Sequence, residues 1–198
     1  MNDATNPRGI PDIRPIEPDE ITIEGAEALR RIFRTDPRGF LIETLRSDDS
    51  SVNGGRFQMS YSSLTLPEHY RDRDRWHVHR IQTDRFVVVL GEMTLALYDD
   101  RPGSTTRGTL EVIRMIGAPL PFRGESSPGD STTYLVPIPP GVLHCIGNLS
   151  RELFLLQNYP TELYNPADEG RIPFVDLHLP RQGGTFDWAR VERTASKS

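Results

Sequence analysis

Two stretches decide the fold of this chain, His77-x-His79-x4-Asp84-x6-Gly91 and Pro139-x-Gly141-x2-His144-x3-Asn148. On a β-strand, residues two positions apart project from the same face, so His77 and His79 share a face and a hairpin can return Asp84 to them. The Pro-Gly turn delivers His144 onto a later strand. The pattern predicts three imidazoles and one carboxylate gathered on short strands of a β-barrel.

This residue set has a metal-binding interpretation. Three neutral imidazoles and one carboxylate suit a divalent cation such as zinc, iron, manganese or nickel, with positions left open for water or substrate. The candidate metal ligands are His77, His79, Asp84 and His144. An ion held by them would polarise the oxygen atoms of a small substrate.

The two stretches resemble the signature motifs of the cupin superfamily. The first has Asp84 where that motif usually has Glu, and the second matches without a departure. The resemblance implies an all-β fold, the cupin-type double-stranded β-helix or jelly-roll barrel.

The flanking sequence resembles a narrower family along most of the chain. Residues 36–43, 91–101 and 164–170 look like the dTDP-4-dehydrorhamnose 3,5-epimerase family. The resemblance implies a sugar-nucleotide substrate and an isomerase that needs no cofactor. In that chemistry a histidine removes a proton beside a ketone, and a tyrosine returns one from the opposite face. It also implies a homodimer in which N-terminal strands exchange between barrels.

Carried over by position, the resemblance implies roles for individual residues. His77 falls at the catalytic base and His144 at a second pocket histidine, while nucleotide-contacting positions hold Arg38, Glu43 and Glu169. The position of the catalytic tyrosine holds Asn158. Tyr159, one step along, is the candidate catalytic acid, although on a regular strand it points to the other face unless a bulge intervenes.

Other positions depart from the family pattern. Asp84 stands where a lysine contacts phosphate, and a carboxylate there would repel a diphosphate. The nucleotide is therefore either bound differently or is not the ligand. The carboxylate that partners the base has no clear match near the C-terminus. Three interpretations stay open: a sugar-nucleotide epimerase or isomerase, a metal-binding cupin, and a catalytically silent binding protein.

Length, charge and cysteine content limit the remaining possibilities. The 198 residues allow one substantial core, which we expect over residues 21–198 after an N-terminal arm at 1–20. The net charge of −5 without a Lys/Arg run argues against a nucleic-acid partner. No apolar run approaches the roughly 20 residues that span a bilayer, and the N-terminus has no secretory pattern. With Cys145 alone no internal disulfide can form, and we expect a cytoplasmic protein without membrane contact.

The periodicity of the chain favours strands over helices. Residues 23–33 carry apolar side chains at helical spacing and predict a short N-terminal helix. Alternating or continuous apolar runs predict strands over 57–62, 86–90, 93–98, 109–115, 133–138, 142–146 and 153–157. Many short strands separated by loops rich in Gly, Pro and Ser favour a jelly-roll barrel.

Overall fold

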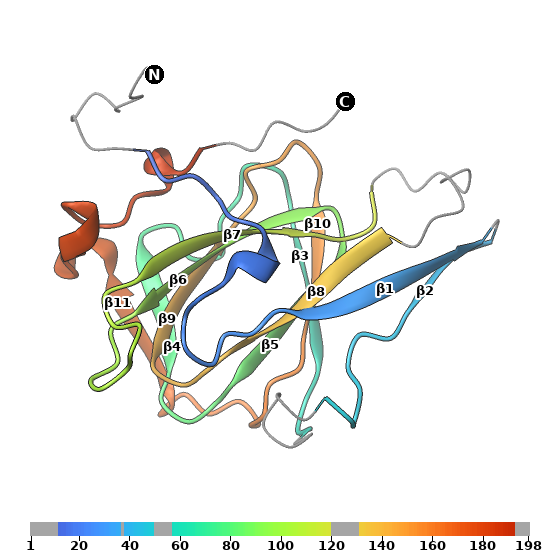
Figure 1. Cartoon of the computed structure of the whole chain (residues 1–198), viewed down its shortest axis with the longest axis horizontal. Coiled ribbons are helices and arrows are strands. Elements are labelled where there is room, and N and C mark those ends of the chain that lie inside the picture. The colour runs from blue at the N-terminus through green and yellow to red at the C-terminus, as the bar shows by residue number, and fades with distance from the viewer. Residues whose placement is uncertain (1–11, 37, 50–56, 120–130, 193–198) are drawn as a thin grey trace.

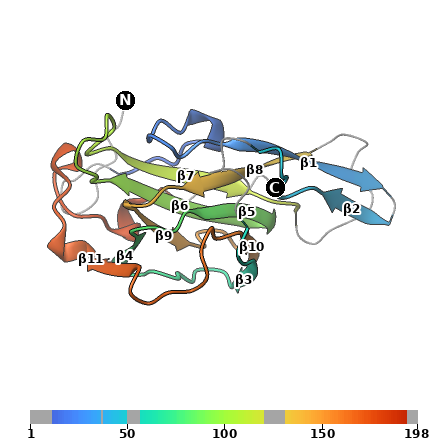
Figure 2. The same ribbon diagram turned by 90° about the horizontal axis from the view of Figure 1, so that it is seen from below.

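The chain folds into two antiparallel β-sheets that face each other, as a computed structural model of residues 12–36, 38–49, 57–119 and 131–192 shows (Figures 1 and 2). The six-stranded sheet has the order β2-β1-β8-β5-β10-β3, and the five-stranded sheet has the order β11-β4-β9-β6-β7. The strands are β1 (Leu29–Asp36), β2 (Gly39–Ile42), β3 (Tyr61–Thr65), β4 (Arg75–His79), β5 (Asp84–Leu90), β6 (Glu92–Asp99), β7 (Leu110–Ile116), β8 (Ser131–Ile138), β9 (Val142–Gly147), β10 (Phe154–Asn158) and β11 (Glu169–Pro173). The predicted all-β jelly-roll fold is confirmed.

Successive side chains of each strand point alternately to the inner and the outer face of its sheet. On β5, Phe86 and Val88 point into the main core between the sheets, together with Leu95 and Leu97 of β6. Val87, between the two inward residues, belongs instead to a small cluster outside the six-stranded sheet. Burying both faces explains why β5 and β6 are almost continuously apolar rather than alternating.

The C-terminal segment covers the outer face of the five-stranded sheet. Trp76 of β4 and Cys145 of β9 point outward and pack with Phe186 and Trp188 of that segment. Three short 3-10 helices lie in it, at Phe174–Asp176, Pro180–Gln182 and Trp188–Arg190. The neighbours of Trp76 and Cys145 on their strands therefore point inward.

Two glycines make the turns that the cupin-like motifs require. Gly91, with φ +73°, joins β5 to β6, and a Cβ there would lie 2.0 Å from the Leu153 carbonyl oxygen. Gly141, with φ +81°, ends the Pro-Gly turn before β9, and its N–H donates to the His79 carbonyl 2.7 Å away. Side chains with a Cβ rarely adopt these backbone angles.

The predicted helix over residues 23–33 is wrong. Its C-terminal part is β1, whose register places Phe33 opposite Ile42 of β2 and Ser131 of β8. Phe33 and Arg31 are both buried, which is the period of a strand rather than of a helix. Pairing on both edges outweighs a weak local helical pattern. The helical element before it is one 3-10 turn, Pro18–Glu20.

The other predicted strands coincide with β5 to β10, although the alternation over 57–62 begins before β3 does. Part of the N-terminal arm, residues 1–11, lies outside the described residues. Its described part touches the barrel, with bridges from Ile13 to Val191 and from Ile16 to Ile113. In the described ranges, no helix has the length and apolar character needed to cross a membrane.

Candidate active site

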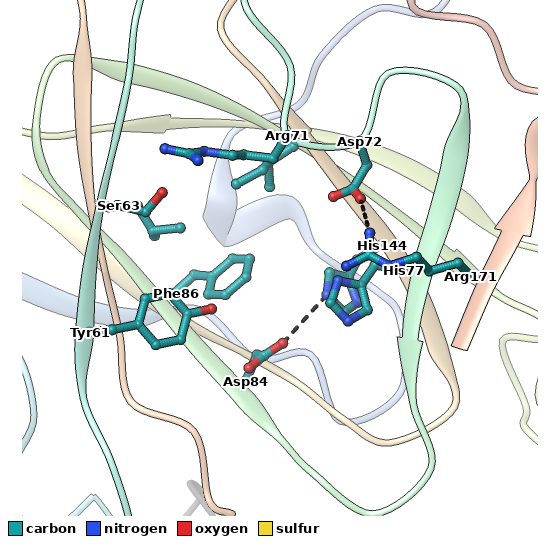
Figure 3. A pocket seen from close by; sticks show the side chains of 11 residues that line it. Tyr61, Ser63, Arg71, Asp72, His77, Asp84, Phe86, His144 and Arg171 are labelled. Carbon is teal, nitrogen blue, oxygen red and sulfur yellow. Dashed lines mark hydrogen bonds and ion pairs between the residues drawn. The ribbon is translucent and has the colours of Figure 1, made fainter. Parts of the chain in front are cut away.

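A cavity of about 270 Å³ opens between the two sheets and is lined largely by polar side chains (Figure 3). Strands β3, β5 and β10 form one wall, and β4, β9 and β11 contribute to the other. The lining residues are Tyr61, Ser63, Arg71, Asp72, His77, Asp84, Phe86, His144, Ile146, Leu156 and Arg171. Its size lies near the lower end of small-molecule sites.

His77 lies on the β4 wall with a side chain only 21% exposed. Burial, followed by the positive charges that His144 and His79 would carry, lowers the pKa of His77 to about 3. The ring is therefore neutral at neutral pH and able to accept a proton. Its Nε2 atom lies 3.4 Å from Glu169 Oε1. A carboxylate at that position stabilises an imidazolium once the proton has been taken.

Consecutive carboxylates approach the two histidines of β4. Glu169 approaches His77, whereas Asp168 Oδ2 lies 3.2 Å from His79 Nδ1. Asp168 also accepts hydrogen bonds from the backbone N–H groups of residues 80–82, at 3.0, 2.8 and 3.1 Å. Burial opposes the ionisation of Asp168, but these three donors outweigh it and lower its pKa. The loop after β4 is thereby tied to the start of β11.

Asp84 forms the polar floor of the cavity. Its Oδ1 atom accepts from Gln82 Nε2 and from Asn158 Nδ2, both at 2.8 Å. Its Oδ2 atom lies 3.4 Å from His144 Nε2 and 3.6 Å from His79 Nε2. Burial opposes ionisation here too, but the contacts with His144, His79 and Asn158 together outweigh it, and the pKa of Asp84 is lowered. Asp84 is thus a buried carboxylate committed to protein partners.

Two arginines lie at the rim above this floor. Arg171 pairs with buried Asp72 at 3.1 Å and also contacts Glu169. Arg71 donates to Thr65 Oγ1 at 3.1 Å and to the Leu64 carbonyl, and no carboxylate among the described residues pairs with it. The Arg71 guanidinium can therefore meet an anionic part of a ligand, whereas Arg171 can do so only beside its two carboxylate partners.

The structure brings His77, His79, Asp84, His144 and Glu169 together, but it separates Tyr159 from them. Tyr159 contacts the outer cluster beside Val87 and Leu135, and its hydroxyl hydrogen-bonds to Thr44 Oγ1. The pairing of β10 with β5 does shift register, but between Leu155 and Leu156 rather than beside Tyr159. Tyr159 as the catalytic acid is therefore a prediction that the geometry contradicts.

Arg38 and Glu43 also lie away from the cavity. Arg38, at the tip of the β1–β2 hairpin, is 89% exposed and pairs with Asp36 at 2.6 Å. Glu43 follows β2 and pairs with Arg46 at 2.5 Å. Neither residue lines the cavity that contains His77.

The four candidate metal ligands do not form a recognisable metal centre. His77 Nε2 faces Glu169, whereas Asp84 Oδ2 lies near His79 and His144. Across the described ranges, no group of three or more His, Cys, Asp or Glu side chains could hold a metal ion.

Several cavity residues were missed by the sequence reasoning. Tyr61 falls within the alternating stretch 57–62, so its parity with Ser63 was available as a signal. Arg71 and Asp72 precede β4 in an irregular segment, and Arg171 lies on a strand that no apolar pattern marks. Their positions depend on tertiary structure.

Sequence comparison finds two proteins of polysaccharide or glycan biosynthesis, one of them a probable epimerase, among the relatives of this chain. No protein-family model matches. The probable low-salt glycan biosynthesis epimerase Agl13 of Haloferax volcanii is 35% identical over 142 residues, which cover 70% of this chain and 80% of that protein. The spore coat polysaccharide biosynthesis protein SpsL of Bacillus subtilis is 30% identical over 156 residues, covering 78% and 91%.

Structure comparison finds the same fold in a solved enzyme. The dTDP sugar isomerase of Desulfovibrio desulfuricans superposes with a TM-score of 0.68 at 24% identity, covering 86% of this chain and 95% of that one. The fold is thus that of a cupin-type barrel, with a histidine-carboxylate cavity between its sheets. The chain belongs to the same family as Agl13, a family of epimerases of glycan biosynthesis, and it has the fold of the dTDP sugar isomerase.

Proposed function

We propose that this protein epimerises or isomerises a nucleotide-linked keto sugar, with His77 as the base that removes a proton beside the ketone. The observation that carries the proposal is the contact between His77 Nε2 and Glu169 Oε1, 3.4 Å, on the wall of the cavity. A ring with a pKa of about 3 is a weak base on its own. Glu169 supplies the negative charge that stabilises the imidazolium as the proton transfers.

The nucleotide part of the substrate is assigned to the rim. A diphosphate needs cationic partners. Arg71 and Arg171 line the cavity, and both are exposed, so they lie at its solvent-facing rim. Asp84 is 3% exposed on the floor, so its carboxylate is held by His144 and Asn158 instead of meeting the phosphates. The diphosphate is therefore bound by the rim arginines and not at the position where the family has a phosphate-contacting lysine. That a solved relative is a dTDP sugar isomerase supports a nucleotide-linked ligand.

We further propose a homodimer. The β1–β2 hairpin extends away from the barrel (Figures 1 and 2), and its Leu41 is 61% exposed. Arg38 and Glu43, which the family resemblance assigns to nucleotide contacts, lie away from the cavity of their own protomer. Seating the hairpin on a partner barrel would bury Leu41 and carry both residues toward the partner's cavity. A buried lone cysteine and a nucleotide-sugar substrate fit a cytoplasmic location.

The experiment is turnover of dTDP-4-dehydro-6-deoxy-D-glucose and of its UDP-linked counterpart, with the sugar product identified by NMR. We expect the wild-type protein to form an epimerised or isomerised sugar, and His77→Asn to form none while unfolding at an unchanged temperature. Product formation by His77→Asn at the wild-type rate would contradict the assigned base.

A further inference from the structure

Tyr61 occupies the wall of the cavity across from the histidines. It lies at the start of β3, an edge strand, and shares the inner face with Ser63. Figure 3 shows its hydroxyl pointing into the cavity from the side opposite His77. The residue is 43% exposed, so water reaches it from outside the barrel. A phenol in this position faces a bound sugar from the side that His77 does not occupy.

The neighbour of Tyr61 on the sheet is Asn158, the position where the family has its tyrosine. The two residues are directly opposed in the pairing of β3 with β10. Asn158 Nδ2 lies 2.9 Å from the Tyr61 hydroxyl and 2.8 Å from Asp84 Oδ1. Replacing the family's tyrosine by Asn158 thus leaves a phenol at the cavity, supplied by the adjacent strand.

The hydrogen bonds of Asn158 decide which way the phenol proton points. Asn158 Oδ1 accepts the backbone N–H of Arg85 at 2.8 Å, which fixes the amide orientation and makes Nδ2 the donor to both other partners. The Tyr61 oxygen is therefore an acceptor from Asn158. Its own proton is not used in that bond and can be donated into the cavity.

We propose that Tyr61 is the general acid of this enzyme, delivering a proton to the sugar carbon on the face opposite His77. The inference rests on the proposed function. His77 takes the proton from the carbon beside the ketone, which leaves an enolate and an imidazolium. The enolate carbon then takes the Tyr61 proton, which restores the ketone and leaves a phenolate. Solvent returns a proton to Tyr61, and His77 releases its proton to solvent, so the cycle balances.

Two physical consequences follow from this arrangement. Burial of the hydroxyl, and then the charge of Asp84, raise the pKa of Tyr61, so the phenol is protonated at neutral pH as an acid must be. Removal from one face and return to the other inverts the carbon. The reaction is therefore an epimerisation, whereas a shift of the ketone along the ring can use a base on a single face.

The test compares Tyr61→Phe with Tyr159→Phe on dTDP-4-dehydro-6-deoxy-D-glucose in D2O, following by NMR both the epimerised sugar and deuterium at the sugar carbons. Loss of a positioned acid costs about 10²–10⁴-fold in rate. We expect Tyr61→Phe to lose epimerised product by that factor, with KM nearly unchanged, while deuterium still enters the unepimerised sugar through His77. Tyr159→Phe should retain both signals.

Three results would overturn the assignment of Tyr61. The first is epimerised product from Tyr61→Phe at the wild-type rate, and the second is loss of both deuterium exchange and product in a Tyr61→Phe protein that unfolds at the wild-type temperature. The third is loss of product in Tyr159→Phe instead of Tyr61→Phe. Absence of exchange with the wild-type protein would overturn the proposed function itself, and this outcome is distinct from the other three.

Discussion

Asn158 Nδ2 donates to the Tyr61 hydroxyl at 2.9 Å and to Asp84 Oδ1 at 2.8 Å, so one amide joins a phenol to a buried carboxylate. Two positions that differ from the family pattern, Asp84 and Asn158, are thereby in direct contact. Asn158 makes the departure at Asp84 tolerable, because a buried carboxylate needs donors and the amide supplies one.

Asn158→Asp should destabilise the protein by about 2–4 kcal/mol at pH 7, because it removes a donor and places a second buried carboxylate beside Asp84. Asn158 is fully buried. Urea unfolding measures the loss. Gln157→Glu is the matched control on the same strand, since its side chain accepts from Ser62 and a carboxylate can still do so. Equal stability of the Asn158→Asp variant and the wild type would count against this contact.

Glu169→Gln should lower kcat by about 10–100-fold with a smaller change in KM, because the variant keeps the shape of the side chain but removes the charge that stabilises the His77 imidazolium. Steady-state kinetics with the keto-sugar nucleotide measures both constants. Asp176→Asn, an exposed acid on the outer C-terminal segment, is the control and should behave as wild type. A change confined to KM would show that Glu169 binds the nucleotide instead.

The stability of the protein should fall as the pH drops below about 6.5. Because the pKa of His77 is lowered from 6.5 to about 3 in the folded state, only the unfolded chain takes up that proton between these values. From pH 6.5 to 5 the wild type should lose roughly 1–2 kcal/mol more than His77→Gln. Urea unfolding at the two pH values tests this, and identical losses would refute it.

The proposed homodimer predicts that Leu41→Asp gives monomers, because a charge at the exposed Leu41 position of the β1–β2 hairpin cannot be buried against a partner. Light scattering after size exclusion gives the mass. Val175→Asp is the control, since Val175 is 79% exposed on the C-terminal segment away from the hairpin. A wild-type protein that is itself monomeric would refute the proposed dimer.

Metal analysis of protein purified without a tag or added ions tests the metal-binding interpretation. Because His77 Nε2 faces Glu169 and no group of three or more His, Cys, Asp or Glu side chains among the described residues could hold an ion, we expect far less than one divalent ion per chain. Near-stoichiometric zinc, iron, manganese or nickel that His79→Ala releases would favour the metal-binding cupin instead.

Strand parity made much of the fold and part of the site predictable. Two histidines with one residue between them had to share a face, and the motif glycines marked the turns. The same parity rule indicated that Tyr159 would leave the cavity, and it does. The apolar spacing over residues 23–33 predicted a helix wrongly, because a strand that is paired on both edges can carry the same residues.

The rest of the site depends on contacts between distant segments. Tyr61 meets Asn158 across 97 positions of sequence, and Arg171 meets Asp72 across 99. Such contacts follow from strand order, which local patterns do not determine. The family resemblance assigns Glu169 to the nucleotide, and the register of β11 with β4, which places Glu169 opposite His79, also brings its carboxylate to His77.

Deuterium exchange tests the central claim most directly. Wild-type protein and dTDP-4-dehydro-6-deoxy-D-glucose are mixed in D2O, and the proton signals beside the ketone are followed by NMR against His77→Asn and a protein-free sample. Removal of that proton by His77 predicts that these signals disappear with the wild type and persist in both controls. Signals that persist with the folded wild-type protein, or that disappear equally fast with His77→Asn, would contradict it.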